Sequence, residues 1–437
     1  MELIFKKNCT FEVLYLTKYF MKKHFTLILL ICLSLKNYGQ EFTEIDIHST
    51  YLNEIKVIRV SIPEGYEDSK KKYPLTLILD SEILFDSYVS NANLFARGKM
   101  SPQQIIIGIN QYQGTNKEKD YGYKVLNSFP HSNSMNTLEF IKQELIPMMK
   151  RKYRIANFKT IIGTEMTANF LNYFLFDSSP AFNAYISINP ELAPDMPEHL
   201  KGFVPQLKGD DTYYYISHGN NPLQKNKNRI DATDVGLAHI SNVYFNYKYE
   251  NFKNASTIVS IPQSIASAQE FIFTMYSPIS TKEYDDNIAY LSPLAAMEYL
   301  LYKYENIEYL FGEKIPIRQE DFVKIESIII DKEEGKHLEE FGELALETHP
   351  KAPLGDYYIG QYFEKLAQYP EALLAYKKGF AKIPQSSPKS YGYYMNIKRI
   401  ISLQKIEKEQ QNNPEPEYTE EGLSEEELLD ENSENVQ

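Results

Sequence analysis

Two short stretches of almost uninterrupted apolar residues constrain the fold more than any other feature of this sequence. They are Tyr73–Asp80 (YPLTLILD) and Ile105–Ile109 (IIIGI). A strand with one solvated face alternates apolar and polar residues, whereas a nearly all-apolar run of this length is typical of a strand buried on both faces. Such strands lie in the middle of a mostly parallel sheet that helices cover on both sides.

Strand and helix patterns alternate through the first part of the chain. Ile55–Ile62 alternates as a strand does, Thr137–Lys150 has the periodicity of an amphipathic helix, and Tyr213–Ser217 is a short, mostly apolar strand. One more strand is expected near Ile258–Ile261. This alternation predicts an α/β domain over residues 40–280.

The pattern changes after about residue 280, and the chain from Leu291 to Leu403 is predicted to be helical. It contains a repeat, because Glu339–Pro350 matches Leu373–Pro384 in a 34-residue register. Repeats of this type bury their apolar faces on neighbours, so residues 281–405 are expected to pack on the α/β domain or on a partner. The second unit has residues at the spacing of a tetratricopeptide helix pair, namely Gly360, Phe363, Ala372, Tyr376, Gly379 and Pro384.

The amino-terminal segment has the composition of a secretory leader. Met21 opens a cationic stretch that is followed by the apolar run Phe25–Leu35 and by the small residue Gly39 before Gln40. This pattern predicts translation from Met21, a signal peptide within residues 1–39 and export to the periplasm or the medium. The apolar run is too short to span a bilayer stably, so no membrane span is expected after cleavage. An uncleaved anchor is the alternative interpretation.

Charge and cysteine content exclude several functions. The chain carries a formal net charge of −13, which argues against nucleic acid and anionic membrane surfaces as partners. Residues 406–437 are predicted to form an acidic disordered tail. Both cysteines, Cys9 and Cys32, lie in the leader, so no disulfide, Cys-ligated zinc or Cys nucleophile is expected. The sequence has no metal-ligand spacing, no phosphate loop and no pattern of a basic groove, and we expect no cofactor.

The segment Thr160–Phe176 has the layout of a nucleophile elbow, the sharp strand-to-helix turn on which an α/β-hydrolase presents its attacking residue. That turn usually has the pattern Gly-x-Ser-x-Gly, because the strained backbone leaves little room for side chains around the nucleophile. Here the residues are Gly163-Thr164-Glu165-Met166-Thr167. Only the first glycine is present, and Glu165 stands at the nucleophile position.

A series of landmarks around this turn resembles the esterase D-like family, which includes bacterial siderophore and acyl esterases. The resemblance covers Ile55 to about Tyr276, and family members with tetratricopeptide-like repeats after the esterase domain are familiar. It implies an α/β-hydrolase fold and a site built for ester hydrolysis by a serine, a histidine and an acid. In chain order the landmarks are Pro63–Tyr66, Tyr73-Pro74, Leu79-Asp80, Gly108–Asn110, Phe140–Pro147, Lys152–Arg154 and Phe182–Ile188.

The departures from that family fall on its catalytic positions. Family enzymes have a histidine beside a serine in the elbow, where this chain has Thr164 and Glu165. The catalytic acid is expected directly after Tyr213–Ser217, but the chain continues there as His218-Gly219-Asn220-Asn221. The catalytic histidine is expected after the following strand, and Pro262–Ser267 contains none. Since a serine is inert without its base, and the base is misoriented without its acid, the resemblance implies a pseudo-esterase.

Two side chains remain candidates for chemistry. Glu165 occupies the elbow, and His218 follows a strand at the carboxyl edge of the sheet, where α/β proteins bind ligands, so the pair could form a partial dyad. The alternatives are a glutamate that only lines a former active-site cleft and a histidine on a surface loop. The other residues expected to line this cleft are Thr164, Met166, Asp80, Ser81 and Asp120.

Three functional hypotheses follow from the sequence. The first is an exported, catalytically silent protein that binds a protein partner through its helical repeats or a small ligand in the former ester cleft. The second is a carboxylic-ester hydrolase with non-standard catalytic residues, Glu165 and His218. The third is a serine esterase that uses Ser81 or Ser187, although neither serine lies at a strand–turn–helix elbow.

Overall fold

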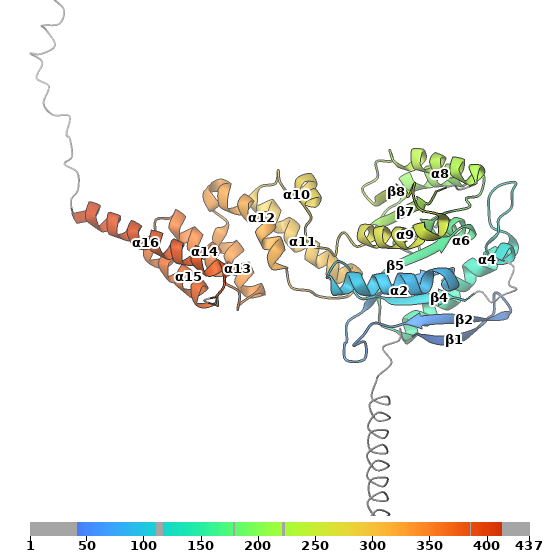
Figure 1. Cartoon of the computed structure of the whole chain (residues 1–437), viewed down its shortest axis with the longest axis horizontal. Helices are drawn as coiled ribbons and strands as arrows, with labels where there is room; N and C mark the ends of the chain where they lie inside the picture. The colour runs from blue at the N-terminus through green and yellow to red at the C-terminus, as the bar shows by residue number, and fades with distance from the viewer. Residues whose placement is uncertain (1–41, 111–116, 178–179, 221–222, 385, 413–437) are drawn as a thin grey trace, which may run out of the picture.

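The computed structural model describes residues 42–110, 117–177, 180–220, 223–384 and 386–412, so the expected leader and most of the expected acidic tail lie outside the described residues. Its centre is an eight-stranded sheet with the order β1-β2-β4-β3-β5-β6-β7-β8 (Figure 1). The strands are β1 (Thr43–Ser49), β2 (Glu54–Ser61), β3 (Tyr73–Ile78), β4 (Ile105–Ile109), β5 (Ile155–Thr164), β6 (Ala184–Ile188), β7 (Thr212–His218) and β8 (Phe245–Asn251).

The sheet is mostly parallel, as the apolar runs predict. Strand β2 pairs antiparallel with both β1 and β4, and every pairing from β4 to β8 is parallel. All residues of β3 and β4 are buried, because helices cover both faces of the sheet at its centre. The edge strands β1 and β8 alternate or are half-exposed, as expected for strands with a solvated side.

Helices form a layer on each face of the sheet. Two apolar cores result, one on each side, and the sheet lies between them. The first layer is α2 (Ser81–Arg97), α9 (Thr257–Ile272) and α11 (Pro293–Phe311). The second layer is α3 (Lys117–Tyr121), α4 (Ser132–Glu139), the π-helical η1 (Phe140–Leu145), α5 (Ile146–Lys152), α6 (Met166–Phe170), η2 (Leu171–Phe174), α7 (Met196–Phe203), η3 (Val204–Gln206) and α8 (Gln224–Leu237).

The prediction of a strand near Ile258–Ile261 is wrong, because this segment forms the first turn of α9. Ser256 caps the helix by accepting a hydrogen bond from the Val259 N–H at 3.4 Å. Ile261, Ile265, Ala268 and Ile272 then recur at helical spacing on the buried face, which outweighs the strand preference of the β-branched start.

The helix expected over Thr137–Lys150 begins earlier, at Ser132, and contains the π-helical segment η1 between α4 and α5. Its first residue follows His131, which provides no side-chain cap.

A helical region follows the sheet and extends away to one side of it (Figure 1). Helix α11 joins the two parts, because Phe311 packs against Phe158 of β5 with ring centroids 5.1 Å apart, and against Phe273 and Tyr276. The apolar core therefore runs without a break from the sheet into the helices. The remaining helices are α10 (Thr281–Asn287), α12 (Gln319–Asp331), η4 (Glu333–Gly335), α13 (Leu338–Thr348), α14 (Leu354–Lys365), α15 (Tyr369–Ala381) and α16 (Lys389–Asn412).

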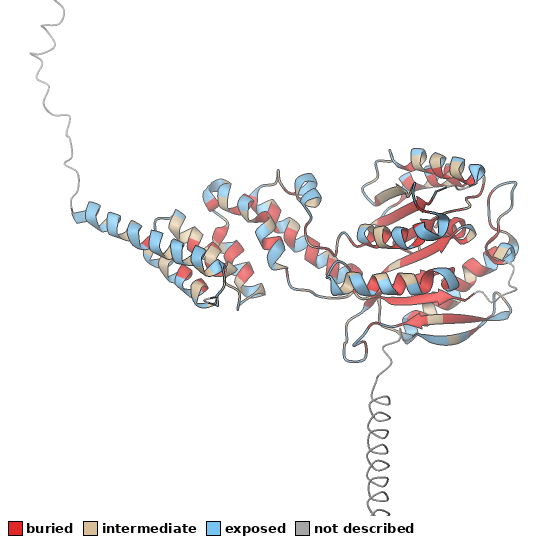
Figure 2. Ribbon diagram, in the orientation of Figure 1, coloured by how far each residue is buried: buried red, intermediate tan, exposed pale blue. Residues whose placement is uncertain are grey.

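Helices α13 to α16 pack in series, and glycines lie where they approach most closely. A Cβ on Gly360 of α14 would lie 2.5 Å from the ring of Tyr376 on α15, and a Cβ on Gly379 of α15 would lie 2.8 Å from the ring of Tyr393 on α16. Ile400 is the one buried residue of α16, so most of this last helix faces solvent (Figure 2). Within the described ranges, no helix combines the length and the apolar character needed to cross a membrane.

Candidate functional site

The strand-to-helix turn between β5 and α6 has the backbone of a nucleophile elbow. Glu165 is the single residue between the two elements, and its dihedral angles are φ 54° and ψ −116°. A residue with a Cβ rarely adopts this conformation, which costs about 1–3 kcal/mol and persists only where the surroundings enforce it. The Glu165 side chain is exposed at the carboxyl edge of the sheet. The structure thus places it where the sequence predicts.

Two neighbours explain how the turn closes. A Cβ on Gly163 would lie 2.7 Å from the backbone carbonyl carbon of Thr167, so glycine is required there. Thr167 takes the place of the second glycine of the usual pattern. Its hydroxyl accepts from the Thr164 N–H at 2.9 Å and lies 2.9 Å from the carbonyl oxygen of Thr164. This hydroxyl holds together the turn that presents Glu165.

Asp80 lies beneath the elbow and is fully buried. Its carboxylate accepts hydrogen bonds from the Thr164 N–H at 3.2 Å and from the Thr167 hydroxyl, and it forms an ion pair of 2.6 Å with the Nζ of Lys117. Burial by itself lowers the pKa of Lys117, but Asp80, and then Glu165 and Glu82, raise it above the ordinary value. Asp80 therefore has a structural role in the elbow. Lys117, the cation beside Glu165, is held in place by its ion pair with Asp80.

His218 is the last residue of β7 and is buried, so it is not the surface-loop histidine of the alternative interpretation. Its Nδ1 lies 2.7 Å from the carbonyl oxygen of Gly219, and its Nε2 lies 3.1 Å from the hydroxyl of Tyr249 on β8. A carbonyl can only accept, so Nδ1 carries the proton, and in the neutral ring Nε2 accepts from Tyr249. The lone pair that a general base would use is occupied.

The structure does not bring His218 and Glu165 together. Thr164 pairs with Ile188 of β6, and Ile188 pairs with Ser217 of β7, so one whole strand separates the two candidates. Two strand spacings amount to roughly 10 Å between the backbones, and the two ring nitrogens of His218 are engaged by Gly219 and Tyr249.

Asn189 fills the space at the end of that intervening strand. Its backbone N–H donates to the Ser217 carbonyl at 2.8 Å, and its Oδ1 accepts from the Gly219 N–H at 2.8 Å. Its Nδ2 donates to the hydroxyl of Ser260 on α9 at 3.0 Å. The loops after β6 and β7 are thereby joined to α9 by an amide side chain, which has no acid–base function.

The other residues predicted to line the cleft are buried or half-buried within the fold. Asp120 is buried and pairs with Lys56 at 2.9 Å, so it does not line an open cleft with Glu165. Ser81 is buried at the start of α2, and its hydroxyl has no partner among the residues that the structure describes. The hydroxyl of Ser187 donates to the Ala168 carbonyl at 3.1 Å from within the sheet. Met166 is half-buried on the helical side of the elbow.

The loop after β8, where the catalytic histidine of the esterase pattern is expected, also lacks a histidine. The strand after β7 is β8, and the loop that follows it, residues 252–256, reads Phe-Lys-Asn-Ala-Ser. Over the ranges that the structure covers, no three His, Cys, Asp or Glu side chains are grouped so that they could hold a metal ion.

Three residues of this site escaped the sequence analysis: Lys117, Asn189 and Tyr249. Lys117 lies 37 residues from Asp80 on a short helix, with no local pattern that links the two. Tyr249 belongs to β8, whose sequence FNYKYEN lacks the apolar run that revealed the central strands. Asn189 had one signal, namely that it follows a buried strand at the carboxyl edge of the sheet.

Removing the Cβ at the elbow should release backbone strain. We expect Glu165→Gly to raise the free energy of unfolding by about 1 kcal/mol, since strain of about 1–3 kcal/mol is partly offset by the flexibility of glycine in the unfolded chain. Urea unfolding of both proteins measures the change. Glu165→Ala is the matched control, because it removes the carboxylate and keeps the Cβ. Equal stabilities of the glycine and alanine variants would contradict a strained elbow.

No model of a known protein family matches this sequence, and no curated protein matches it. Solved structures do match. An uncharacterised protein from Capnocytophaga ochracea is similar with a TM-score of 0.67 and 23% identity, over 83% of this chain and 100% of the other. An IroE-like serine hydrolase from Shewanella oneidensis is similar with a TM-score of 0.52 and 20% identity, over 68% of this chain and 96% of the other. At these identities the likeness shows the fold, an α/β-hydrolase-like sheet followed by a helical region, as predicted.

Proposed function

We propose that this protein is an exported pseudo-esterase of the cell envelope, which keeps the esterase fold for binding and has no hydrolytic activity of its own. One observation carries the proposal. The residue at the elbow is a glutamate, and both ring nitrogens of His218, the candidate base at the end of β7, are engaged by Gly219 and Tyr249.

Loss of the base matters as much as loss of the serine. In triad hydrolases the nucleophile, base and acid act as a unit, and removing the nucleophile or the base alone costs nearly as much as removing all three, about a million-fold in rate. Here Glu165 stands at the nucleophile position, Asn189 joins the loops near the acid position, and residues 252–256 contain no histidine. A carboxylate nucleophile would still need a histidine-activated water to release the acyl group.

The helical region provides a surface that suits a protein partner. A groove of about 1130 Å³ lies between α12, α14 and the start of α16. Its lining mixes apolar, cationic and anionic side chains, among them Arg318, Glu326, Tyr357, Lys382 and Tyr393. The 34-residue register and the glycines at the helix contacts support a tetratricopeptide-like arrangement, and such repeats hold peptides in grooves. A small ligand beside Glu165 and Lys117 is the second binding mode.

Export rests on the leader pattern within residues 1–39, which indicates a periplasmic or secreted protein. Cell fractionation and sequencing of the mature amino terminus test it. A mature protein that begins near Gln40 is the expected result, and a full-length cytoplasmic protein would contradict it.

A carboxylic-ester hydrolase is the alternative, and one observation favours it. The elbow keeps its strained backbone at Glu165 and exposes the carboxylate, as a working nucleophile would require. This mechanism would need His218 to leave Tyr249 and cross the width of β6.

Hydrolysis of short-chain p-nitrophenyl esters separates the two functions. The purified protein from Gln40 to Gln437 is compared with its Glu165→Gln variant, which keeps the size of the side chain and removes its charge. We expect both to release p-nitrophenol at the rate of buffer alone, because both ring nitrogens of His218 are already engaged by Gly219 and Tyr249. Turnover that the Glu165→Gln variant loses would establish the carboxylate as a catalytic residue and overturn the proposal.

A further inference from the structure

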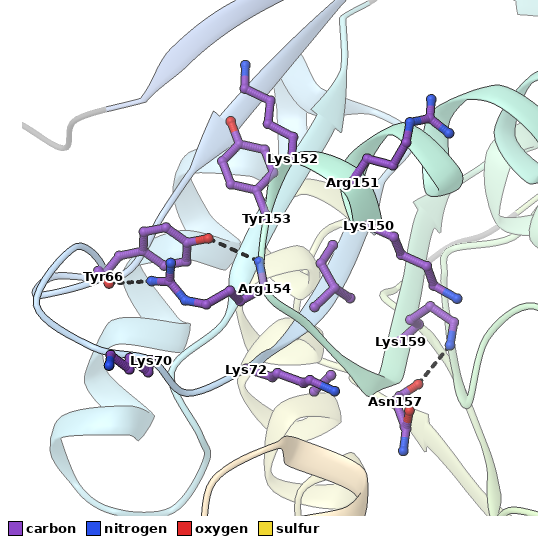
Figure 3. A pocket seen from close by; sticks show the side chains of 12 residues that line it. Tyr66, Lys70, Lys72, Lys150, Arg151, Lys152, Tyr153, Arg154, Asn157 and Lys159 are labelled. Carbon is purple, nitrogen blue, oxygen red and sulfur yellow. Dashed lines mark hydrogen bonds between the residues drawn. The ribbon is translucent and has the colours of Figure 1, made fainter.

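A cationic cavity lies at the edge of the sheet opposite the elbow. Its volume is about 560 Å³, and it is bounded by the loop before β3, the end of α5 and the start of β5 (Figure 3). No acidic residue lines it. Seven of its lining residues are cationic: Lys70, Lys72, Lys150, Arg151, Lys152, Arg154 and Lys159.

Only one of these seven cations, Arg154, has its charged group engaged by several contacts within the protein. Arg154 donates to the carbonyl oxygens of Tyr66 and Lys71, and its guanidinium lies 3.7 Å from the centre of the Tyr66 ring. The other six form no ion pair with any residue that the structure describes. Such a concentration of unpaired positive charge is unexpected in a chain of net charge −13.

The end of a helix explains only part of this charge. Lys150, Arg151 and Lys152 form the last turn of α5, where cations are favoured by the helix dipole. Lys70 and Lys72 lie on a loop, and Lys159 lies within β5, so the dipole of α5 does not account for them. Three separate segments thus contribute cationic residues to the lining of one cavity.

Lys159 is half-buried. Its Nζ donates to the Asn157 carbonyl at 2.7 Å (Figure 3). Burial, and then the charge of Lys150, lower the pKa of Lys159 to about 8, although the nearby Asp210 acts in the opposite direction. A bound anion would offset both causes of this shift.

We propose that this cavity binds a ligand through its phosphate groups. Phosphate suits the site because several lysines and an arginine from different segments can each donate to its oxygens. The cavity lies at the amino-terminal ends of β3 and β5, and the elbow lies at the carboxyl end of β5. From Lys159 to Glu165 the strand advances by roughly 20 Å, so the two sites are separate. The site is a local exception to the expectation, based on net charge, that anionic surfaces are not partners.

Calorimetric titration with inorganic pyrophosphate tests the site in the protein from Gln40 to Gln437. The variant is Lys72→Glu/Lys150→Glu, which reverses two exposed charges, and the matched control is Lys225→Glu on the exposed surface of α8. We expect the double variant to bind at least about tenfold more weakly, and the control to bind as the wild type does. Binding should weaken from pH 7 to pH 9 as Lys159 loses its proton, and as salt increases.

Further arms identify the source of the phosphate. Flotation with phosphatidylglycerol vesicles, against phosphatidylcholine vesicles, tests a lipid headgroup. Binding to either pyrophosphate or the anionic vesicles that the double variant loses supports the site. No binding to either at low salt, or equal loss in the Lys225→Glu control, would overturn it. Pyrophosphate binding that appears only when residues 413–437 are deleted would also overturn it, because the acidic tail would then be the occupant.

Discussion

Replacing Asp80 with alanine is expected to lower the free energy of unfolding by about 3 kcal/mol, because its carboxylate is the buried acceptor beneath the elbow. The substitution leaves the Thr164 N–H and the Thr167 hydroxyl each without one of their partners, and it leaves Lys117 unpaired. Lys117 is partly exposed and can turn towards water. Most of the cost therefore comes from the two buried donors that lose an acceptor and from the cavity that the removed carboxylate leaves. Urea unfolding measures the change.

Asp80→Asn is the matched variant, since its amide oxygen can still accept from the Thr164 N–H. Its cost should be about 1–2 kcal/mol, which isolates the lost charge. The raised pKa of Lys117 means that this lysine stays charged in the native state beyond its ordinary range, and its stabilising effect is lost only as pH rises through that raised value. The difference between the wild type and Asp80→Asn should therefore be constant from pH 7 to pH 9. An Asp80→Ala variant as stable as the wild type would contradict a structural role.

Replacing Phe311 with alanine is expected to cost about 3–5 kcal/mol, the usual range for a buried phenylalanine. Phe311 is almost completely buried where α11 meets the sheet, against Phe158, Phe273 and Tyr276. Because the core is continuous across this junction, the wild type should unfold in one transition, and the variant should let the helices unfold before the sheet. Calorimetry, with far-UV circular dichroism, distinguishes one transition from two.

The control for this prediction is Tyr302→Ala, which removes an aromatic ring from the solvent face of the same helix, where 61% of the residue is exposed. Its effect should stay within about 0.5 kcal/mol. If Phe311→Ala and Tyr302→Ala behaved alike, or if the wild type already unfolded in two steps, the helical region would be an independent unit.

The sheet could be predicted from the sequence where its strands are buried on both faces. Tyr73–Ile78 and Ile105–Ile109 are all apolar or nearly so, and both form central strands. The edge strands were missed because their half-exposed residues mix polar with apolar types, as in Phe245–Asn251. Thr257–Ile272 was mistaken in part for a strand, since its β-branched start outweighed the helical spacing of the buried residues that follow.

The candidate site was predictable to the extent that it is local. The elbow is a contiguous motif, so the place of Glu165 followed from Gly163 and the flanking strand and helix. Contacts between distant segments did not follow. The partner of His218, Tyr249, lies on β8, a strand that the sequence pattern does not indicate, so the sequence alone leaves a dyad with Glu165 open. The ion pair of Asp80 with Lys117 likewise depends on tertiary structure alone.

Turnover by a Glu165→Ser variant is the most direct measurement of the central claim, that the elbow lacks a working base as well as a serine. The variant introduces the serine of the usual Gly-x-Ser-x-Gly elbow, and p-nitrophenyl acetate is the substrate. The account predicts that Glu165→Ser hydrolyses the ester no faster than the wild type and Glu165→Gln, because the Nε2 of His218 stays with Tyr249. Hydrolysis that rises at least about a hundredfold in the serine variant, the contribution typical of a general base, would show that a base reaches the elbow and would contradict the account.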